Sequence, residues 1–191
     1  VFRRPSSSSF SRRNFNIMNI LKGKNIYLRA LEPEDLDFLF AIENDENLWE
    51  VSGTQMPFSK FILKQYLEQA HLDIYQAKQL RLVISKKNED LPIGLIDLFD
   101  FDPQHKRAGI GIVITENNQG QGFAKDALET LIKYCFSTLQ LHQIYANILE
   151  DNHKSISLFT QQGFEKVGLK KDWISYQNTF KNEVLFQLIN K

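Results

Sequence analysis

The fold is decided by a strand-to-helix junction that reads Ile110-Gly111-Ile112-Val113-Ile114-Thr115 and then, a short way on, Gln119-Gly120-Gln121-Gly122-Phe123-Ala124. The first stretch alternates isoleucine with its neighbours, which is typical of a strand, and the second opens the longest amphipathic helix of the chain. Two glycines one residue apart let the backbone curl, so that several N–H groups and the free donors of the helix N-terminus face one point. The junction predicts an anion site of the pyrophosphate kind.

This junction does not match the two common nucleotide-binding motifs. The chain has no G-x-x-x-x-G-K-[ST] sequence and therefore no P-loop. The Rossmann fingerprint requires a third glycine, a preceding parallel strand and an acidic residue for the ribose, whereas these glycines follow a predicted antiparallel meander. A G-x-G pair alone is also typical of a simple tight turn, so the anion site needs support from the rest of the chain.

Hydrophobic periodicity around the junction predicts the element order β-α-α-β-β-β-α-β-α-β-β. Short connections predict that the three central strands form an antiparallel meander. The segment from Glu43 to Pro57 is polar and predicts a loop, Ser59 is expected to cap the second helix, and Gly163 is expected to end the last helix in a left-handed conformation. The expected strands lie at 25–31, 80–84, 93–101, 107–115, 144–148, 173–176 and 183–188, and the expected helices at 33–43, 59–70, 124–139 and 152–162.

Composition limits the classes of function. The chain is 42% hydrophobic and 24% charged, so it can form a full core. Lys plus Arg equals Asp plus Glu at 23 each, which removes a global field for nucleic acid or an anionic membrane, and no apolar run is long enough to predict a membrane span. The single cysteine, Cys135, excludes an internal disulfide and is expected to be buried and unreactive. We expect no metal site, because metal-ligand spacing is absent among His71, His105, His142 and His153.

The N-terminal segment differs in composition from the rest of the chain. It contains arginines and a serine run but no acidic residue before Glu32. This composition is typical of an organellar transit peptide, of a disordered tail, or of leader sequence upstream of a start at Met18. We predict that residues 1–24 are a disordered leader or tail, that the domain spans residues 25–191, and that the protein is cytoplasmic. Organellar import would follow if residues 1–17 were a genuine transit peptide.

Three stretches together resemble the GNAT family of N-acetyltransferases. The stretch from Gln119 to Ala124 matches the family's acetyl-CoA motif, Q/R-x-x-G-x-G/A, at every fixed position. A second stretch is similar to the family's N-x-x-S/A-I-x-L-Y…G-F block; it reads Asn152-His153-Lys154-Ser155-Ile156-Ser157-Leu158-Phe159 and runs into Gln162-Gly163-Phe164. The third, Leu28-Arg29 with Leu31-Glu32-Pro33-Glu34-Asp35, resembles the opening strand and helix. The pattern is most similar to the spermidine (polyamine) acetyltransferases and the ribosomal-protein N-terminal acetyltransferases.

The resemblance implies an α+β GNAT fold, in which a mixed, mostly antiparallel sheet splays at its central strands and is flanked by helices. Acetyl-CoA would be the co-substrate, without a metal, and its pantetheine would lie in the gap against backbone groups of Ile112, Val113 and Ile114. The pyrophosphate would bind at Gln119, Gly120, Gln121, Gly122, Phe123 and Ala124. The pantetheine would also contact Asn152, Ser155 and Phe159, although an asparagine three residues before a serine fits an ordinary helix N-cap as well. Members of this family often form homodimers.

The implied reaction is direct transfer of acetyl to a neutral primary amine, which requires a base and a donor for the thioester carbonyl. By analogy with the family, a backbone N–H near Val113 is the carbonyl donor. Asp97 and Asp100 are the candidate bases, and alternation places them on opposite faces of one strand, with Asp97 preferred. A water chain as base, with both carboxylates merely solvated, is the alternative.

The leaving thiolate needs a proton, and here the sequence departs from the family. Many members carry a tyrosine where this chain has Phe159, and phenylalanine cannot donate a proton. The resemblance leaves three alternatives: water, a more distant hydroxyl such as that of Tyr145 or Ser157, or a thiolate that leaves without a specific acid.

In the family, the loop between the first two helices and the C-terminal hairpin form the walls of the acceptor site. Here the loop reads Glu43-Asn44-Asp45-Glu46-Asn47-Leu48-Trp49-Glu50, with four carboxylates and one indole. Such a loop suits a cationic amine, so Glu43, Glu46 and Trp49 are the candidate substrate-binding residues. The acceptor would be a polyamine, a protein N-terminal amine or another small-molecule or peptide amine. A solvated acidic loop, and a GNAT-shaped module that binds acetyl-CoA or a partner without catalysis, are the alternatives.

Overall fold

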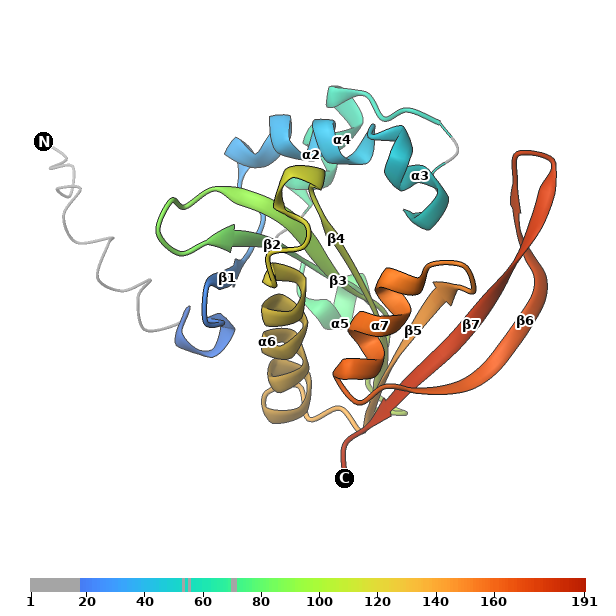
Figure 1. Cartoon of the computed structure of the whole chain (residues 1–191). Coiled ribbons are helices and arrows are strands. Elements are labelled where there is room, and N and C mark those ends of the chain that lie inside the picture. The colour runs from blue at the N-terminus through green and yellow to red at the C-terminus, as the bar shows by residue number, and fades with distance from the viewer. Residues whose placement is uncertain (1–17, 53, 55, 70–71) are drawn as a thin grey trace, which may run out of the picture.

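One mixed sheet of seven strands runs through the computed structural model, in the order β1-β2-β3-β4-β5-β7-β6 (Figure 1). The structure describes residues 18–52, 54, 56–69 and 72–191. The strands are β1 (Ile26–Arg29), β2 (Leu80–Lys86), β3 (Pro92–Asp102), β4 (Arg107–Ile114), β5 (Gln143–Leu149), β6 (Glu165–Tyr176) and β7 (Thr179–Ile189). The α-helices are α2 (Leu36–Glu43), α3 (Glu46–Ser52), α4 (Lys60–Glu68), α5 (Ile74–Ala77), α6 (Phe123–Ser137) and α7 (His153–Gln161), and the 3-10 helices are η1 (Met18–Leu21), η2 (Pro33–Asp35) and η3 (Glu116–Asn118).

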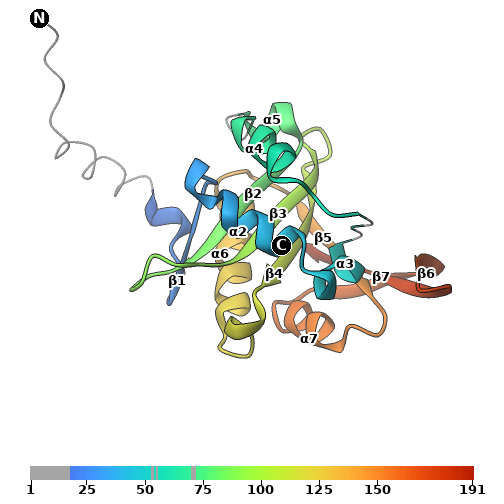
Figure 2. The same cartoon turned by 90° about the horizontal axis from the view of Figure 1, so that it is seen from above.

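Helices cover both faces of the sheet, with α6 and α7 on one face and α2 and α4 on the other (Figure 2). The buried side chains of α6, such as Leu128, share one apolar core with Ile96 of β3. On the opposite face, Leu39 of α2 and Leu63 of α4 form a second core with Val83 of β2. Burial of each such side chain contributes about 1.5–3 kcal/mol, and the two cores hold the central strands as a fixed platform. The predicted α+β class is confirmed.

The central strands β4 and β5 are parallel but pair over only a short length. Their register joins Arg107 to Gln143 and ends at Gly109 opposite Tyr145. β4 remains paired with β3, and β5 with β7, far beyond that point. Because each strand follows its own antiparallel partner and sheets twist, the two diverge and leave a gap between residues 110–114 and 146–149. The predicted meander and the predicted splay are both confirmed.

Three segments differ from the sequence-based expectations. The segment 43–57, predicted as a loop, contains α3, which begins after Asp45: the Leu48 N–H donates to the Asp45 carbonyl at 2.9 Å, and the Asn47 N–H donates to its side chain at 3.0 Å. The short helix α5 was not expected, and its N-cap is Asp73, whose side chain accepts from two backbone N–H groups. The closing hairpin was expected, but β6 and β7 are much longer than predicted because β6 is exposed along most of its length and lacks alternation.

The N-terminal segment is part of the domain surface from residue 18 onward. Leu21 of η1 packs against the larger core. The Asp126 carboxylate, in the first turn of α6, accepts hydrogen bonds from the N–H groups of Lys24, Asn25 and Ile26. The prediction of a disordered leader otherwise concerns residues 1–17, which lie outside the described residues. Among the helices that the structure describes, none is long and apolar enough to cross a membrane.

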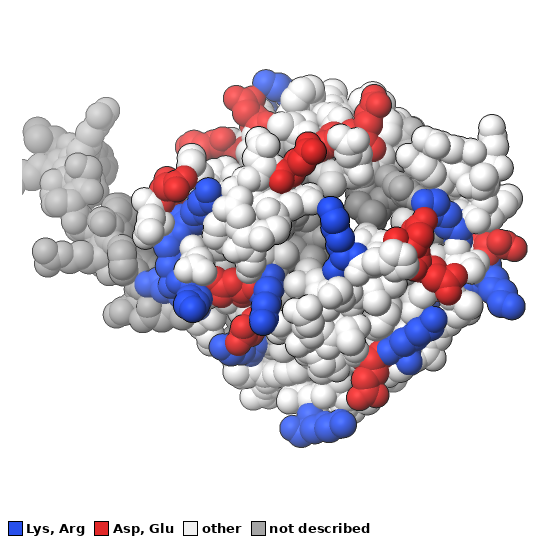
Figure 3. All heavy atoms as spheres, viewed as in Figure 1, with Lys and Arg blue, Asp and Glu red and all other residues white. Residues whose placement is uncertain are grey.

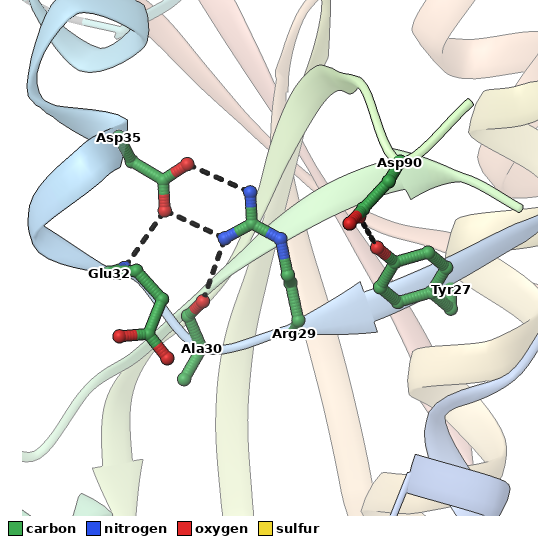
Figure 4. A network of polar contacts seen from close by, with 6 residues as sticks. All are labelled: Tyr27, Arg29, Ala30, Glu32, Asp35 and Asp90. Atoms are coloured by element: carbon green, nitrogen blue, oxygen red, sulfur yellow. Dashed lines mark hydrogen bonds and ion pairs between the residues drawn. The ribbon is translucent and has the colours of Figure 1, made fainter. Parts of the chain in front are cut away.

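A buried ion pair ties β1 to the start of η2 and α2 (Figure 4). Asp35 is only 4% exposed and accepts from Arg29 Nη1 at 2.7 Å and Nη2 at 2.8 Å. The Glu32 N–H donates to the same carboxylate at 2.8 Å, which satisfies a free donor of the first turn. Burial raises the pKa of Asp35, but the hydrogen bonds from Arg29 and Glu32 and the charge of Arg29 lower it by more, so the pKa lies below its ordinary value.

We predict that Asp35→Asn lowers the free energy of unfolding by about 3 kcal/mol at pH 7, because it leaves the buried Arg29 without its counter-ion. A carboxylate with a lowered pKa stabilises the fold above its unfolded-state pKa of about 4 and loses that contribution as the pH falls through the folded-state value. In urea unfolding, the difference in the free energy of unfolding between wild type and variant should therefore be smaller at pH 3 than at pH 7. The matched control is Asp37→Asn, which removes an exposed ion pair with Lys60 and should change stability little at either pH. An equal difference in the free energy of unfolding at both pH values would show that the ionised Asp35 carboxylate is not the source of this stability.

Candidate active site

A cavity of about 360 Å³ opens where β4 and β5 diverge. Its walls are backbone and side chains of both strands, one face of α7, and the end of α2 with the neighbouring part of the sheet. In Figure 1 the two strands diverge upward from the end where they meet, and α7 lies in front of them. Acidic and basic side chains are interspersed over this face of the molecule (Figure 3). The lining includes the predicted site residues Glu43, Asp97, Ile112, Val113, Asn152, Ser155 and Phe159.

Backbone groups of β4 point into the gap. The Thr115 N–H donates to the Ile93 carbonyl at 2.9 Å, and the register with β3 is unbroken over residues 109–114. Because hydrogen bonding alternates along an antiparallel pair, the peptide groups of Val113 point to β3 and those of its two neighbours point away from β3. The N–H groups available on the β5 side therefore belong to Ile112 and Ile114.

The glycine loop has the form of an anion site. Gly120 and Gly122 have φ of 74° and 83°, and nothing lies within 4 Å of the position that a Cβ would occupy on either one. α6 begins at Phe123, and within the described ranges the N–H groups of Gly122, Phe123 and Ala124 donate to no carbonyl or side chain. The Gln119 side chain has a different role, since its Nε2 donates to the Ile114 carbonyl at 3.1 Å and fastens the loop to the end of β4.

One face of α7 lines the cavity with Asn152, Ser155 and Phe159. Asn152 caps the helix, since its Oδ1 accepts from the Ser155 N–H at 3.1 Å. Phe159 is 3% exposed and stacks edge-on against Phe164, with ring centroids 5.0 Å apart. Ser155 precedes Phe159 by one helical turn, so its hydroxyl and the phenyl ring lie on the same face.

The opposite wall contains Arg81, which the sequence analysis missed. Arg81 Nε donates to Asp97 Oδ1 at 2.8 Å and Nη2 donates to Oδ2 at 3.1 Å, while Nη1 donates to Glu43 Oε1 at 2.5 Å. Asp97, the preferred candidate base, is therefore held by two hydrogen bonds from one guanidinium. The signal available in the sequence was an arginine inside an otherwise apolar strand, Leu80-Arg81-Leu82-Val83-Ile84.

Two other candidates for the acceptor site lie outside this wall. Glu46 is exposed and does not line the cavity. Trp49 also lies outside the lining, and its Nε1 donates to the Glu43 carbonyl at 3.1 Å. Among the carboxylates of the acidic loop whose side chains the structure describes, that of Glu43 lines the cavity.

The alternative base and the distant hydroxyls lie elsewhere. Asp100 has φ of 48° within a β-bulge, and it accepts from the Tyr145 hydroxyl at 3.2 Å beside a second cavity. Burial, and then the charge of Asp100, raise the pKa of Tyr145 to about 12. The Ser157 hydroxyl is exposed and accepts from Gln161 Nε2 at 3.1 Å. Of the hydroxyl groups considered, only that of Ser155 belongs to the cavity between β4 and β5.

Cys135 does not line this cavity. It is fully buried in α6, which confirms the predicted burial, and burial raises the pKa of its thiol to about 12. Among the residues that the structure describes, no cluster of His, Cys, Asp and Glu side chains is arranged to hold a metal ion.

Comparison with known proteins agrees with this geometry. Residues 25–165 match the Acetyltransferase (GNAT) domain family. The spermidine N(1)-acetyltransferase of Vibrio cholerae is 31% identical over 141 residues, which cover 74% of this chain and 79% of that protein. The uncharacterized N-acetyltransferase p20 of Bacillus licheniformis is 29% identical over 175 residues, which cover 91% of this chain and 98% of that protein.

The fold also matches a solved structure with a bound cofactor. The crystal structure of spermidine N-acetyltransferase from Vibrio cholerae in complex with CoA and spermine has a TM-score of 0.79 to this chain at 25% sequence identity. The match covers 86% of this chain and 95% of that one. On the family match and on this fold, the chain belongs to the GNAT family and is an N-acetyltransferase.

Proposed function

We propose that this N-acetyltransferase uses acetyl-CoA and transfers its acetyl group directly to the primary amine of a small cationic acceptor. The observation that carries the proposal is the cavity that opens where β4 and β5 diverge, with unpaired peptide groups on one strand and charged side chains on the far wall. A relative solved with CoA and spermine has the same fold, which supports both the cofactor and the class of acceptor.

In this proposal the cofactor lies along β4. The N–H of Ile114 and the C=O groups of Ile112 and Ile114 pair with the amides of the pantetheine as an added strand would. The N–H groups of Gly122, Phe123 and Ala124 bind the pyrophosphate at the positive end of α6. Asn152 and Phe159 contact the pantetheine from α7, and this role is compatible with the cap that Asn152 provides.

The same geometry suggests how each proton moves. The ammonium group of the acceptor, bound beside the carboxylate of Asp97 that Arg81 holds in place, gives one proton to a neighbouring water, which releases it to solvent. The amine nitrogen then attacks the thioester carbon, and the developing oxyanion accepts from the N–H of Ile112, which is farther from the pyrophosphate loop than that of Ile114. The C–S bond breaks, and the Ser155 hydroxyl, which lies on the cavity face of α7, donates a hydrogen bond to the leaving thiolate. The attacking nitrogen, positively charged after the attack, gives its second proton to water as the amide forms, and water supplies the proton that makes the thiol.

A panel of amines tests this proposal. Release of CoA should be observed when the protein and acetyl-CoA are mixed with spermidine, and the panel should include amino acids and a peptide with a free N-terminus.

Gly122→Asp should weaken acetyl-CoA binding at least tenfold, because a carboxylate placed in the glycine loop repels the pyrophosphate. Gln104→Asp, which adds the same charge at an exposed position in the turn before β4, at the end of that strand away from the glycine loop, is the matched control for charge.

Two outcomes would contradict the proposal differently. The second candidate function is a GNAT-shaped module that binds acetyl-CoA without catalysis, and the observation in its favour is the phenyl ring of Phe159 where the family carries a proton donor. Tight binding of acetyl-CoA in calorimetry, with no thiol released by any amine, would establish that module. Failure of acetyl-CoA to bind at millimolar concentration would exclude both functions.

The missing proton donor gives a second prediction. Phe159→Tyr places a phenol hydroxyl at the cavity and should raise kcat for CoA release by about tenfold, since a positioned donor lowers the barrier to thiolate departure. Ser155→Ala should lower kcat by about tenfold in wild type and have little effect in the Phe159→Tyr background, because the phenol replaces the serine as donor. Ser157→Ala, an exposed serine on the same helix, is the control. Additive effects of the two active-site substitutions would show that Ser155 does not serve as this donor.

A further inference from the structure

Arg81 of β2 connects two carboxylates from distant parts of the chain on the far wall of the cavity. Its guanidinium donates through Nε and Nη2 to Asp97 of β3 and through Nη1 to Glu43 at the end of α2. The Tyr66 ring of α4 covers it, with 5.6 Å between the guanidinium carbon and the ring centroid. This group of charges, Glu43, Arg81 and Asp97, is called the charged triad below.

The charged triad is largely enclosed and carries a net negative charge. The side chains of Glu43, Arg81 and Asp97 are 15%, 28% and 29% exposed. Burial lowers the pKa of Arg81, but the charge and hydrogen bonds of Asp97 raise it well above its ordinary value, so the guanidinium stays protonated. Two carboxylates and one guanidinium sum to −1, and a single additional cation would make the wall neutral.

Rigid elements hold the charged triad in place. Arg81 and Asp97 are direct partners in the antiparallel pair of β2 and β3, so their side chains leave the same face of the sheet. The end of α2 is braced by Asn44, whose Nδ2 donates to the carbonyls of Phe40 at 2.9 Å and Phe58 at 3.1 Å, and whose Oδ1 accepts from the Phe58 N–H at 2.8 Å. A carboxylate oxygen can accept two hydrogen bonds. Each oxygen that Arg81 reaches accepts one bond from it and therefore keeps one lone pair free.

We propose that Arg81 is a positioning residue for the acceptor, holding Glu43 and Asp97 so that their remaining lone pairs bind the ammonium group of an alkylamine. The inference rests on the proposed function and narrows it: the acceptor enters as a cation and compensates the charge of −1. An amine that is neutral at pH 7, such as an aniline, lacks this interaction. The guanidinium fork sets the directions of the lone pairs, so an equal charge in another shape does not replace it.

The test compares variants that keep the charge with variants that change the geometry. Arg81→Lys keeps the positive charge but removes the forked guanidinium. The double variant Arg81→Gln with Asp97→Asn keeps the net charge of −1 and leaves no partly buried Asp97 carboxylate without its arginine. Both should raise the KM for spermidine by about tenfold and leave the KM for acetyl-CoA within about twofold. Arg107→Lys, at a half-exposed arginine that pairs with Asp102, is the matched control and should change neither. Thermal unfolding of each variant reports whether the fold is intact.

The outcomes separate this inference from the proposed function. An unchanged KM for spermidine in both variants, or KM values for spermidine and acetyl-CoA that rise together, would overturn the positioning role while acetyl transfer itself stands. If the wild-type protein releases no CoA with any amine, the positioning role of Arg81 is tested instead by calorimetry of spermidine binding to the CoA-loaded protein. Binding that Arg81→Lys weakens about tenfold supports the inference, and absence of binding to the wild-type protein overturns it.

Discussion

The short parallel pairing of β4 with β5 is the constraint on which the rest of the site depends. Each strand follows a long antiparallel ladder of its own, and the two ladders meet over only a few residues around Gly109 and Tyr145. Peptide groups beyond that meeting point lose the partner that a continuous sheet would give them, and a buried unpaired group costs about 1–3 kcal/mol. A ligand with its own amides, or water, can satisfy them, so the place where the sheet is interrupted is also well suited to an extended ligand such as the proposed cofactor arm.

The charged triad adds a second local cost on the other side of this gap. Taking Arg81, Glu43 and Asp97 partly out of water is unfavourable, although the interactions with Asp97 keep Arg81 in its charged form. Apolar side chains of similar size in place of such a group of charges are often neutral or stabilising. Apolar side chains at these positions would pack against Tyr66 and the second core without such a cost. The charged triad is therefore better explained by a role in the cavity than by stability. The pair of Arg29 and Asp35 differs, because the Asp35 carboxylate also accepts from the Glu32 N–H at the start of η2.

Much of the fold was predictable because it depends on local patterns. The alternating isoleucines of β4, the apolar face of α6 and the left-handed Gly163 each follow from a few neighbouring residues. α3 was missed because a polar segment hid a helix start at Asp45, and the extent of β6 was missed because an exposed edge strand need not alternate. The face of the sheet on which Asp100 lies was predicted from regular alternation along the strand, and the bulge at Asp100 interrupts that alternation. No pattern in the sequence marks a bulge of this kind.

The two halves of the candidate site differ in how far the sequence reveals them, and the reason is physical. The cofactor half is built from backbone: a strand, a glycine turn and a helix start that are contiguous, so their sequence is a motif. The acceptor half is built from side chains that meet only after folding, since Glu43 and Arg81 are 38 positions apart and Asp97 is a further 16 along. Glu43 was identified from the composition of its loop, whereas Arg81 has meaning only beside its partners. On the proposed assignment, acceptor specificity depends on tertiary structure, and single side-chain changes can alter it while the cofactor motif stays the same.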